Sequence, residues 1–186
     1  TRSFCFGAMP EGYARAYTAV FKAFHALATL RFPKGTQGHQ IDAICRRPLW
    51  DLGLDYDHGT GHGIGHCLSV HEHPQRICKE VNPVDLVPGM VLSIEPGYYA
   101  AGRFGIRIEN LFEIVEDTDG FLSFRNLTFA PIQTDMLETG SLTAGELSWL
   151  NAYHREVVER VSPFLSDAAR DWLVAACAGL ALPAAR

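Results

Sequence analysis

The sequence lacks the patterns that mark several classes of protein. It has no run of about 18 apolar residues, so no membrane-spanning helix is expected. Its first residues do not combine a charged segment with an apolar one, as a secretory signal would. Its 16 basic and 21 acidic residues give a net charge of −5, and the lysines and arginines are not clustered. A phosphate-binding surface is therefore missing, and we expect neither nucleic acid nor a membrane as a partner.

Cysteine is also scarce. The five cysteines are odd in number, widely scattered and never spaced as CxxC. This pattern disfavours structural disulfides and a thiolate zinc site, and it favours a reducing cytoplasm. The cysteines are Cys5, Cys45, Cys67, Cys78 and Cys177.

The length of 186 residues, with 47% hydrophobic residues, indicates one globular domain or a large part of one. The chain opens on Thr1 rather than on methionine, which predicts that it was cut from a longer protein.

Apolar residues at helical spacing predict a helix over residues 10–31, ending at the turn Phe32-Pro33-Lys34-Gly35. A second helical stretch follows around residues 41–45, and Pro48 should end or kink it. Four glycines alternate with other residues over 59–65. Each glycine costs a helix about 1 kcal/mol relative to alanine, so this segment should be loop or strand.

Strand-like composition follows in four segments, the last two joined by a hairpin turn at 116–120 with an Asp-Gly pair. After Pro131 the sequence pattern changes from strand-like to helical. A long amphipathic helix should begin at 141–143, and a last helix should be capped by Ser166 or Asp167. The order of helices, strands and helices predicts an α+β fold with helices against a mainly antiparallel sheet. The four strand segments are 67–72, 90–94, 105–115 and 121–129.

Histidines gather in the glycine-rich region, where five of the eight occur between positions 58 and 73. The HxxxH spacing of His58 and His62 would suit a zinc pair on a helix, but the glycines exclude a helix there. A metal site would then be built on loop and strand, with only some of these histidines as ligands; the others would decorate an exposed loop. The five are His58, His62, His66, His71 and His73.

Two glutamates supply candidate partners for such a histidine. Glu95 ends the apolar run VLSIE, and Glu109 lies within GIRIEN, where Arg107 and Glu109 would share one face of a strand. A carboxylate in an apolar strand must be paired or must bind a metal. One alternative is a plain ion pair of Arg107 with Glu95 or with Glu109. The other is a metal site, because imidazole and carboxylates suit Zn, Mn or Co.

The segments GTGHGIGHCLSVHEHP (59–74), EPGYY (95–99) and GIRIEN (105–110) resemble the signature motifs of the pita-bread metallopeptidases, most closely the Xaa-Pro aminopeptidases, or aminopeptidases P. SLTAGELSWLNAYHREV (141–157) is similar to the C-terminal extension of their long cytosolic type. The resemblance implies a pita-bread fold, with a truncated catalytic domain over 1–133 and a C-terminal helical extension over 134–186.

The resemblance also implies roles for particular residues. His62, Glu95 and Glu109 would be metal ligands, with Glu109 bridging two ions. His58 and His71 would bind substrate and stabilise the tetrahedral intermediate. Tyr99 and Arg107 would support the site.

One departure from the family pattern concerns two further aspartate ligands, one of which directly precedes a Thr-Arg segment. Thr1-Arg2 resembles that segment, so both aspartates would lie before the chain begins. Since a two-metal centre needs carboxylates on both ions, we expect this chain by itself to be inactive and to hold metal weakly or singly. The parent would use two divalent ions, manganese being favoured over zinc or cobalt, to hydrolyse the bond between an N-terminal residue and a following proline.

Other interpretations remain open. Methionine aminopeptidase and prolidase share parts of these motifs, and some pita-bread proteins without metals act as binding modules. His66 and His73 stand where the family has other residues, and His73 is expected to face water. The apolar stripe Leu147, Leu150, Tyr153 and Val157 would cover either the chain's own sheet or a second subunit. The resemblance favours a cytoplasmic homodimer through the C-terminal region.

Overall fold

The computed structural model describes residues 1–67 and 69–181. Its main sheet has six strands, and a separate two-stranded hairpin lies beside it. All strand pairs are antiparallel, which confirms the predicted α+β class. In spatial order the sheet contains β1 (Phe32–Pro33), β8 (Phe121–Asn126), β7 (Asn110–Glu116), β4 (Val91–Ile94), β2 (Gly61–Gly63) and β3 (Glu72–Ile77); the hairpin contains β5 (Gly97–Ala100) and β6 (Phe104–Arg107).

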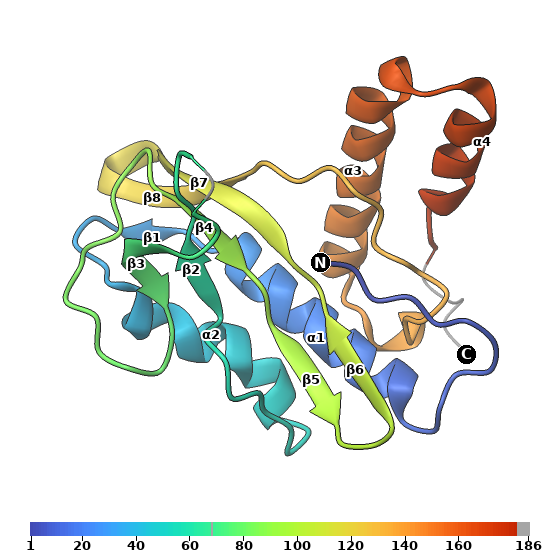
Figure 1. Ribbon diagram of the computed structural model, residues 1–186, viewed down its shortest axis with the longest axis horizontal. Coiled ribbons are helices and arrows are strands. Elements are labelled where there is room, and N and C mark those ends of the chain that lie inside the picture. Colours follow the sequence, from blue (N-terminus) through green and yellow to red (C-terminus); the bar gives the residue numbers. More distant parts are fainter. Residues whose placement is uncertain (68, 182–186) are drawn as a thin grey trace.

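Helix α1 (Tyr13–Ala28) forms the centre of the core and passes behind the sheet and the hairpin (Figure 1). Tyr17, Phe21 and Phe24 are completely buried on its inner face. Each such side chain contributes about 1.5–3 kcal/mol by leaving water. The helix was expected over 10–31, but it begins after Gly12, whose φ of +78° is outside the helical region.

Helix α2 (Gly38–Trp50) packs beside α1 and begins with a capping box formed by Gln37 and Gln40. Of the two expected effects of Pro48, ending or kinking the helix, the first is wrong, because the helix passes through Pro48 to Trp50. Pro48 lies in the last turn, where a missing N–H removes only one helical hydrogen bond. Two further residues therefore remain helical.

Two of the expected strands were misplaced. Residues 67 and 69–71 are turns and bends, and the strand begins only at Glu72, where β3 pairs with β2; Leu68 is outside the described residues. The expected strand 105–115 is in fact two strands, β6 and β7, with Ile108 and Glu109 between them. They separate because β6 pairs with β5 while β7 pairs with β4 and β8. Strand β5 was not expected.

The remaining strand predictions are confirmed with small changes. β4 covers the segment predicted over 90–94, and β8 ends at Asn126 rather than at Phe129. The predicted hairpin joins β7 to β8 through the 3-10 turn η1 (Thr118–Gly120). Asp119 and Gly120 both have positive φ there, as a tight turn requires.

The C-terminal helices α3 (Ala144–Val161) and α4 (Asp167–Ala176) lie at one end of the molecule, away from the sheet (Figure 1). The 3-10 turn η2 (Thr139–Ser141) precedes α3, and η3 (Ser162–Phe164) separates the two helices. A capping box of Thr143 and Glu146 starts α3, and Ser166 is the N-cap residue of α4. The apolar stripe of α3 is buried within the chain's own core, beside α1, so it is not left for a second subunit: Leu147, Leu150, Tyr153 and Val157 are at most 7% exposed.

Two expectations from composition can be compared with the structure. All five cysteines are free thiols, so the described chain has no disulfide. Among the described residues, none of the helices combines the length and the apolar character that crossing a membrane requires.

Candidate metal centre

Three predicted ligands converge at one end of the central strands. His62 is on β2, Glu95 directly follows β4, and Glu109 directly precedes β7. One ligand atom from each lies within 4.8 Å of the others, the one such group found among residues 1–67 and 69–181. The sheet register explains this convergence: Ile94 pairs with Asn110, so the next residue outward on each strand is one of the two glutamates.

Arg107 contacts this group, so the ion-pair alternative is partly realised. Its Nη1 lies 3.5 Å from Oε2 of Glu95, while Nε2 of His62 lies 3.3 Å from Oε1 of the same carboxylate. No ion pair joins Arg107 to Glu109 among the described residues. Glu109 is not on a shared strand face with Arg107, as had been expected, because the strand is broken between them. The ion pair and the ligand group thus occur together.

Electrostatics favour a cation between the two glutamates. Burial and the neighbouring Glu109 raise the pKa of Glu95, although His62 and Arg107 oppose this. One imidazole and two carboxylates within reach of each other form a donor set that Mn, Zn or Co accepts, and a divalent ion would relieve the repulsion between the carboxylates. The residues present therefore fit the metal that the resemblance implies.

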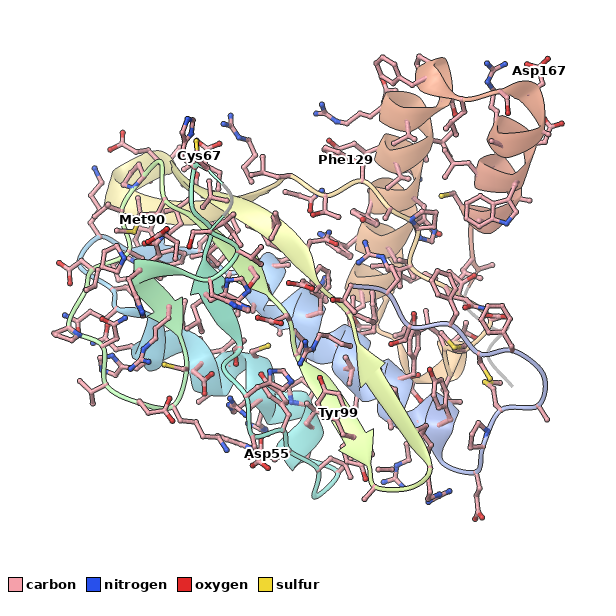
Figure 2. All side chains as sticks on the ribbon, in the orientation of Figure 1. Asp55, Cys67, Met90, Tyr99, Phe129 and Asp167 are labelled. Atoms are coloured by element: carbon pink, nitrogen blue, oxygen red, sulfur yellow. The ribbon has the colours of Figure 1, made fainter. Side chains whose placement is uncertain are left out.

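His58, Tyr99 and Arg107 form a hydrogen-bonded chain beside the ligand group. The hydroxyl of Tyr99 lies 2.9 Å from Nε2 of His58 and accepts a hydrogen bond of 2.8 Å from Nε of Arg107. Tyr99 lies on the β5–β6 hairpin (Figure 2). Burial lowers the pKa of His58 and raises the pKa of Tyr99, so neutral forms of both are favoured.

His71 reaches the same site from the exposed segment before β3. Its ring centre lies 4.3 Å from that of His62. A cavity of about 430 Å³ opens here, and its lining includes His58, His62, His71, His73, Glu95 and Arg107. His73 is exposed, as predicted, and it also lines this cavity. His66 is exposed and is not part of the lining.

The sequence interpretation missed Ser93, which connects two of the ligands. Its buried hydroxyl accepts a 3.0 Å hydrogen bond from the backbone N–H of His62 and donates one of 3.1 Å to Oε1 of Glu95. The available signal was a serine in the apolar run VLSIE, since a buried hydroxyl requires partners.

Arg2 and Thr1 were also not expected to support a ligand. The hydroxyl group of Thr1 contacts the carboxylate of Glu109. Arg2 donates to the carbonyl oxygen of Glu109 at 2.7 Å and to the hydroxyl of Tyr153 on α3 at 2.8 Å. The sequence motif marked Thr1-Arg2, but only their fold position reveals these contacts.

The glycines around His62 allow close approach of neighbouring strands. A Cβ atom at Gly61 would lie 2.0 Å from the carbonyl oxygen of Ser93, and one at Gly63 would lie 2.4 Å from that of Glu72. Neither glycine has a positive φ. Space, rather than backbone conformation, therefore requires glycine at 61 and 63.

Comparisons with known proteins agree with this geometry. The model of metallopeptidase family M24 matches residues 1–116, and the model of the C-terminal region of peptidase M24 matches residues 120–180. A probable Xaa-Pro aminopeptidase P from Coprinopsis cinerea is 45% identical over 184 residues, covering 93% of this chain and 30% of the relative. The chain thus spans about a third or less of the length of the curated relatives it matches.

Solved structures share the fold. The X-prolyl aminopeptidase of Caenorhabditis elegans, described as a cytosolic enzyme with a di-nuclear active site, matches with a TM-score of 0.91 and 39% identity over 96% of this chain and 31% of its own. The prolidase of Pyrococcus furiosus matches with a TM-score of 0.60 and 30% identity over 69% of this chain and 36% of its own. These likenesses confirm the pita-bread fold, and the family match establishes that the chain belongs to metallopeptidase family M24.

Proposed function

We propose that this chain is the metal-binding part of a longer Xaa-Pro aminopeptidase, which hydrolyses the bond between an N-terminal residue and a following proline. The observation that carries the proposal is the convergence of His62, Glu95 and Glu109 beside a cavity that His58 and His71 also line. The similarity to the C. elegans X-prolyl aminopeptidase over 96% of the chain supports the same substrate class.

His62, Glu95 and Glu109 would hold divalent metal ions, with manganese the favoured metal and Glu109 the bridging ligand. Bound ions of this kind supply an activated water and polarise the scissile carbonyl group. The protein's own contribution is to fix the ligands: Ser93 holds Glu95 and the His62 backbone, while Arg107 contacts Glu95.

His58 and His71 act on the substrate from the two sides of the cavity. His71 can present a ring N–H to the oxygen on which negative charge develops, a contact whose loss costs about 2.7–4 kcal/mol. His58 contacts the carbonyl of Gly59 through Nδ1 and Tyr99 through Nε2, so its Nε2 must exchange the Tyr99 contact for the substrate and carry a proton to do the same. Tyr99 orients His58 by a hydrogen bond to Nε2, and Arg107 in turn holds Tyr99. Tyr99 and Arg107 are thus positioning residues.

Proline in the second position fits a cavity that recognises shape. The proline nitrogen in the scissile bond carries no hydrogen and its φ is fixed, so the substrate cannot pair through that atom as a strand would.

The direct test is a substrate panel on the longer protein loaded with manganese. Release of the N-terminal residue should be fast from Ala-Pro-Ala and slow from Ala-Ala-Ala and Met-Ala-Ala. Preference for Met-Ala-Ala would instead assign methionine aminopeptidase activity. Absence of hydrolysis of every peptide in the metal-loaded protein would favour a binding module.

Prolidase is the second candidate, because the P. furiosus prolidase shares the fold. That match covers 69% of the chain, whereas the family model of the C-terminal region includes residues 120–180 as well. Ala-Pro and Ala-Pro-Ala separate the two activities: a prolidase prefers the dipeptide, and an Xaa-Pro aminopeptidase hydrolyses the tripeptide.

The described chain offers three of the ligands that a dinuclear centre needs, and we propose that the other two are aspartates outside it. The 186-residue chain by itself should then be inactive and should bind less than two equivalents of manganese. Elemental analysis after dialysis measures this ratio. Tight binding of two ions per chain would contradict the proposal.

We also propose that the longer protein is a cytoplasmic homodimer through its C-terminal region. The buried stripe of α3 is used within the chain, so the available apolar side chains are Phe164, Trp172 and Val174, which are 51–87% exposed. Light scattering should give twice the monomer mass. A strictly monomeric protein would exclude this assembly.

A further inference from the structure

A buried arginine lies beneath the loop that carries His58. Arg46, on α2, is 1% exposed. Its Nε donates to Asp42 at 2.6 Å, and its Nη1 donates both to Asp55 at 2.9 Å and to the backbone carbonyl of Tyr56 at 2.6 Å. Its Nη2 donates to the backbone carbonyl of His58 at 2.9 Å. One side chain therefore fastens three points of the 55–58 segment to α2.

The guanidinium group is the part of the side chain that makes this possible. A buried cation is costly unless partners surround it, and Arg46 has two carboxylates, two carbonyl groups and the ring of Tyr56, 3.9 Å from its central carbon. Arginine presents five N–H groups in a rigid plane, whereas lysine presents one ammonium group at the end of a flexible chain. Lysine could keep the pair with Asp42 but could not reach all the other acceptors together.

The same cluster extends to the metal ligands. Asp42 accepts a hydrogen bond from the hydroxyl of Thr60, which also bonds to the hydroxyl of Tyr56 at 2.6 Å. The backbone carbonyl of Thr60 accepts the N–H of Glu95 at 2.7 Å. The loop between α2 and β2 is thus fixed at two points: at His58, by Arg46, and at Thr60, which bonds to the backbone of Glu95.

Residues 54–60 belong to no helix or strand, so no backbone ladder sets the position of His58. Asp55, on this loop, is labelled in Figure 2, and it also pairs with Lys79 at 2.6 Å. A displacement of about 1 Å at a reacting group can cost about a hundredfold in rate. The buried arginine removes that freedom from His58.

We propose that Arg46 is a positioning residue for His58: it holds the 55–60 loop so that the imidazole keeps its place between Tyr99 and the cavity. This inference rests on the proposed peptidase function, and it adds a residue that lies outside the cavity lining. Arg46 acts through His58 and does not touch the substrate.

The test is a double-mutant cycle in the longer protein with manganese, using Arg46→Lys, His58→Ala and both together. Arg46→Lys should lower kcat about ten- to a hundredfold and leave KM and metal content unchanged. In the His58→Ala background the same change should have no further effect on kcat, because the group that Arg46 positions is gone. Losses that multiply in the double variant, or metal content that falls with kcat, would overturn the inference.

Two further variants control for folding. Arg47→Lys changes the neighbouring arginine, which is exposed and pairs with Asp51, and it should leave kcat unchanged. If Arg46→Lys does not fold, Asp55→Asn weakens the same cluster from its exposed side. Its smaller loss in kcat should likewise vanish in the His58→Ala background, and an additive loss would contradict the proposal.

Failure of the proposed function is distinguishable from failure of this inference. If the unaltered protein hydrolyses no peptide, the function is wrong, but the position of His58 can still be measured by the ¹H–¹⁵N resonances of its imidazole. These should shift in Arg46→Lys and not in Arg47→Lys. Unshifted resonances in Arg46→Lys would overturn the inference by themselves.

Discussion

The ligand group and His71 occupy one cavity but are held in different ways. Glu95 is 8% exposed; Ser93 donates a hydrogen bond to its carboxylate, and its backbone N–H donates one to the carbonyl oxygen of Thr60. His71 is exposed and lies in turns before β3, and among the described residues its ring forms no hydrogen bond. The ligand group is thus held by the strands and by hydrogen bonds, whereas His71 projects from an exposed segment without a bond to its ring.

The largest expected effect is the loss of stability when a side chain is added between β2 and β4. Gly61→Ala would place a Cβ atom 2.0 Å from the Ser93 carbonyl oxygen, so the strands must separate. We expect the free energy of unfolding to fall by about 3 kcal/mol or more, measured by urea denaturation. Gly59→Ala is the matched control, because its Cβ would lie 3.5 Å from the nearest atom. Equal stability of the two variants would show that the ligand strands are not tightly packed.

The second prediction distinguishes a histidine that binds metal, His62, from one that contacts the substrate, His71. His62→Ala should reduce manganese affinity, while His71→Ala should keep the metal and lower kcat by about a hundredfold or more, as expected for a lost oxyanion contact. Isothermal titration and steady-state kinetics on the longer protein measure the two quantities. If both variants lose affinity and kcat equally, the proposed difference between strand and loop is wrong.

A smaller effect is expected when only the support of a ligand is removed. Ser93→Ala deletes the hydroxyl that joins Glu95 to the His62 backbone, and loss of such a contact typically lowers metal affinity about 10–100-fold. Manganese titration checks this. Ser123→Ala, a half-buried serine of β8 away from the site, serves as the control and should bind manganese as the unaltered chain does. An unchanged affinity in Ser93→Ala would make the serine dispensable.

The smallest effect concerns a fixed histidine outside the site. His154 is 1% exposed, and its Nε2 accepts the backbone N–H of Ile132. Burial, aided by Arg2, lowers the pKa of His154 to about 4. The unfolded chain takes up this proton near pH 6.5 and the folded chain only near pH 4, so stability falls as the pH decreases through this window, by at most about 1.4 kcal/mol per pH unit.

His154→Gln isolates this contribution, because glutamine can keep an acceptor for Ile132 but does not titrate. Between pH 6.5 and pH 4 the free energy of unfolding should fall less steeply in the variant than in the unaltered chain. If the free energy of unfolding depends on pH equally in both proteins, His154 takes up its proton in the folded chain at the same pH as in the unfolded chain.

Much of the fold was predictable because local patterns decide it. The apolar spacing of α1, the capping box of α3 and the Asp-Gly turn between β7 and β8 are all readable from neighbouring residues. The division of residues 105–115 into β6 and β7 was not, because both halves have strand composition and only the choice of partner strand separates them.

The same distinction applies to the site. Glu95 and Glu109 were candidates because carboxylates are unusual in apolar strands, whereas the choice of His62 among five histidines came only from the resemblance to the pita-bread metallopeptidases. The supports Ser93, Arg46 and Arg2 were missed, because each acts on a residue far along the chain or on the backbone. Such contacts depend on the completed fold and leave little trace in a local pattern.

The position of the β5–β6 hairpin has a consequence for how this fold tolerates change. The hairpin joins Glu95 to Glu109, yet the pairing of Ile94 with Asn110 already sets the distance between the two glutamates. The exposed tip at residues 101–103 could therefore be lengthened or exchanged without altering the spacing of the ligands.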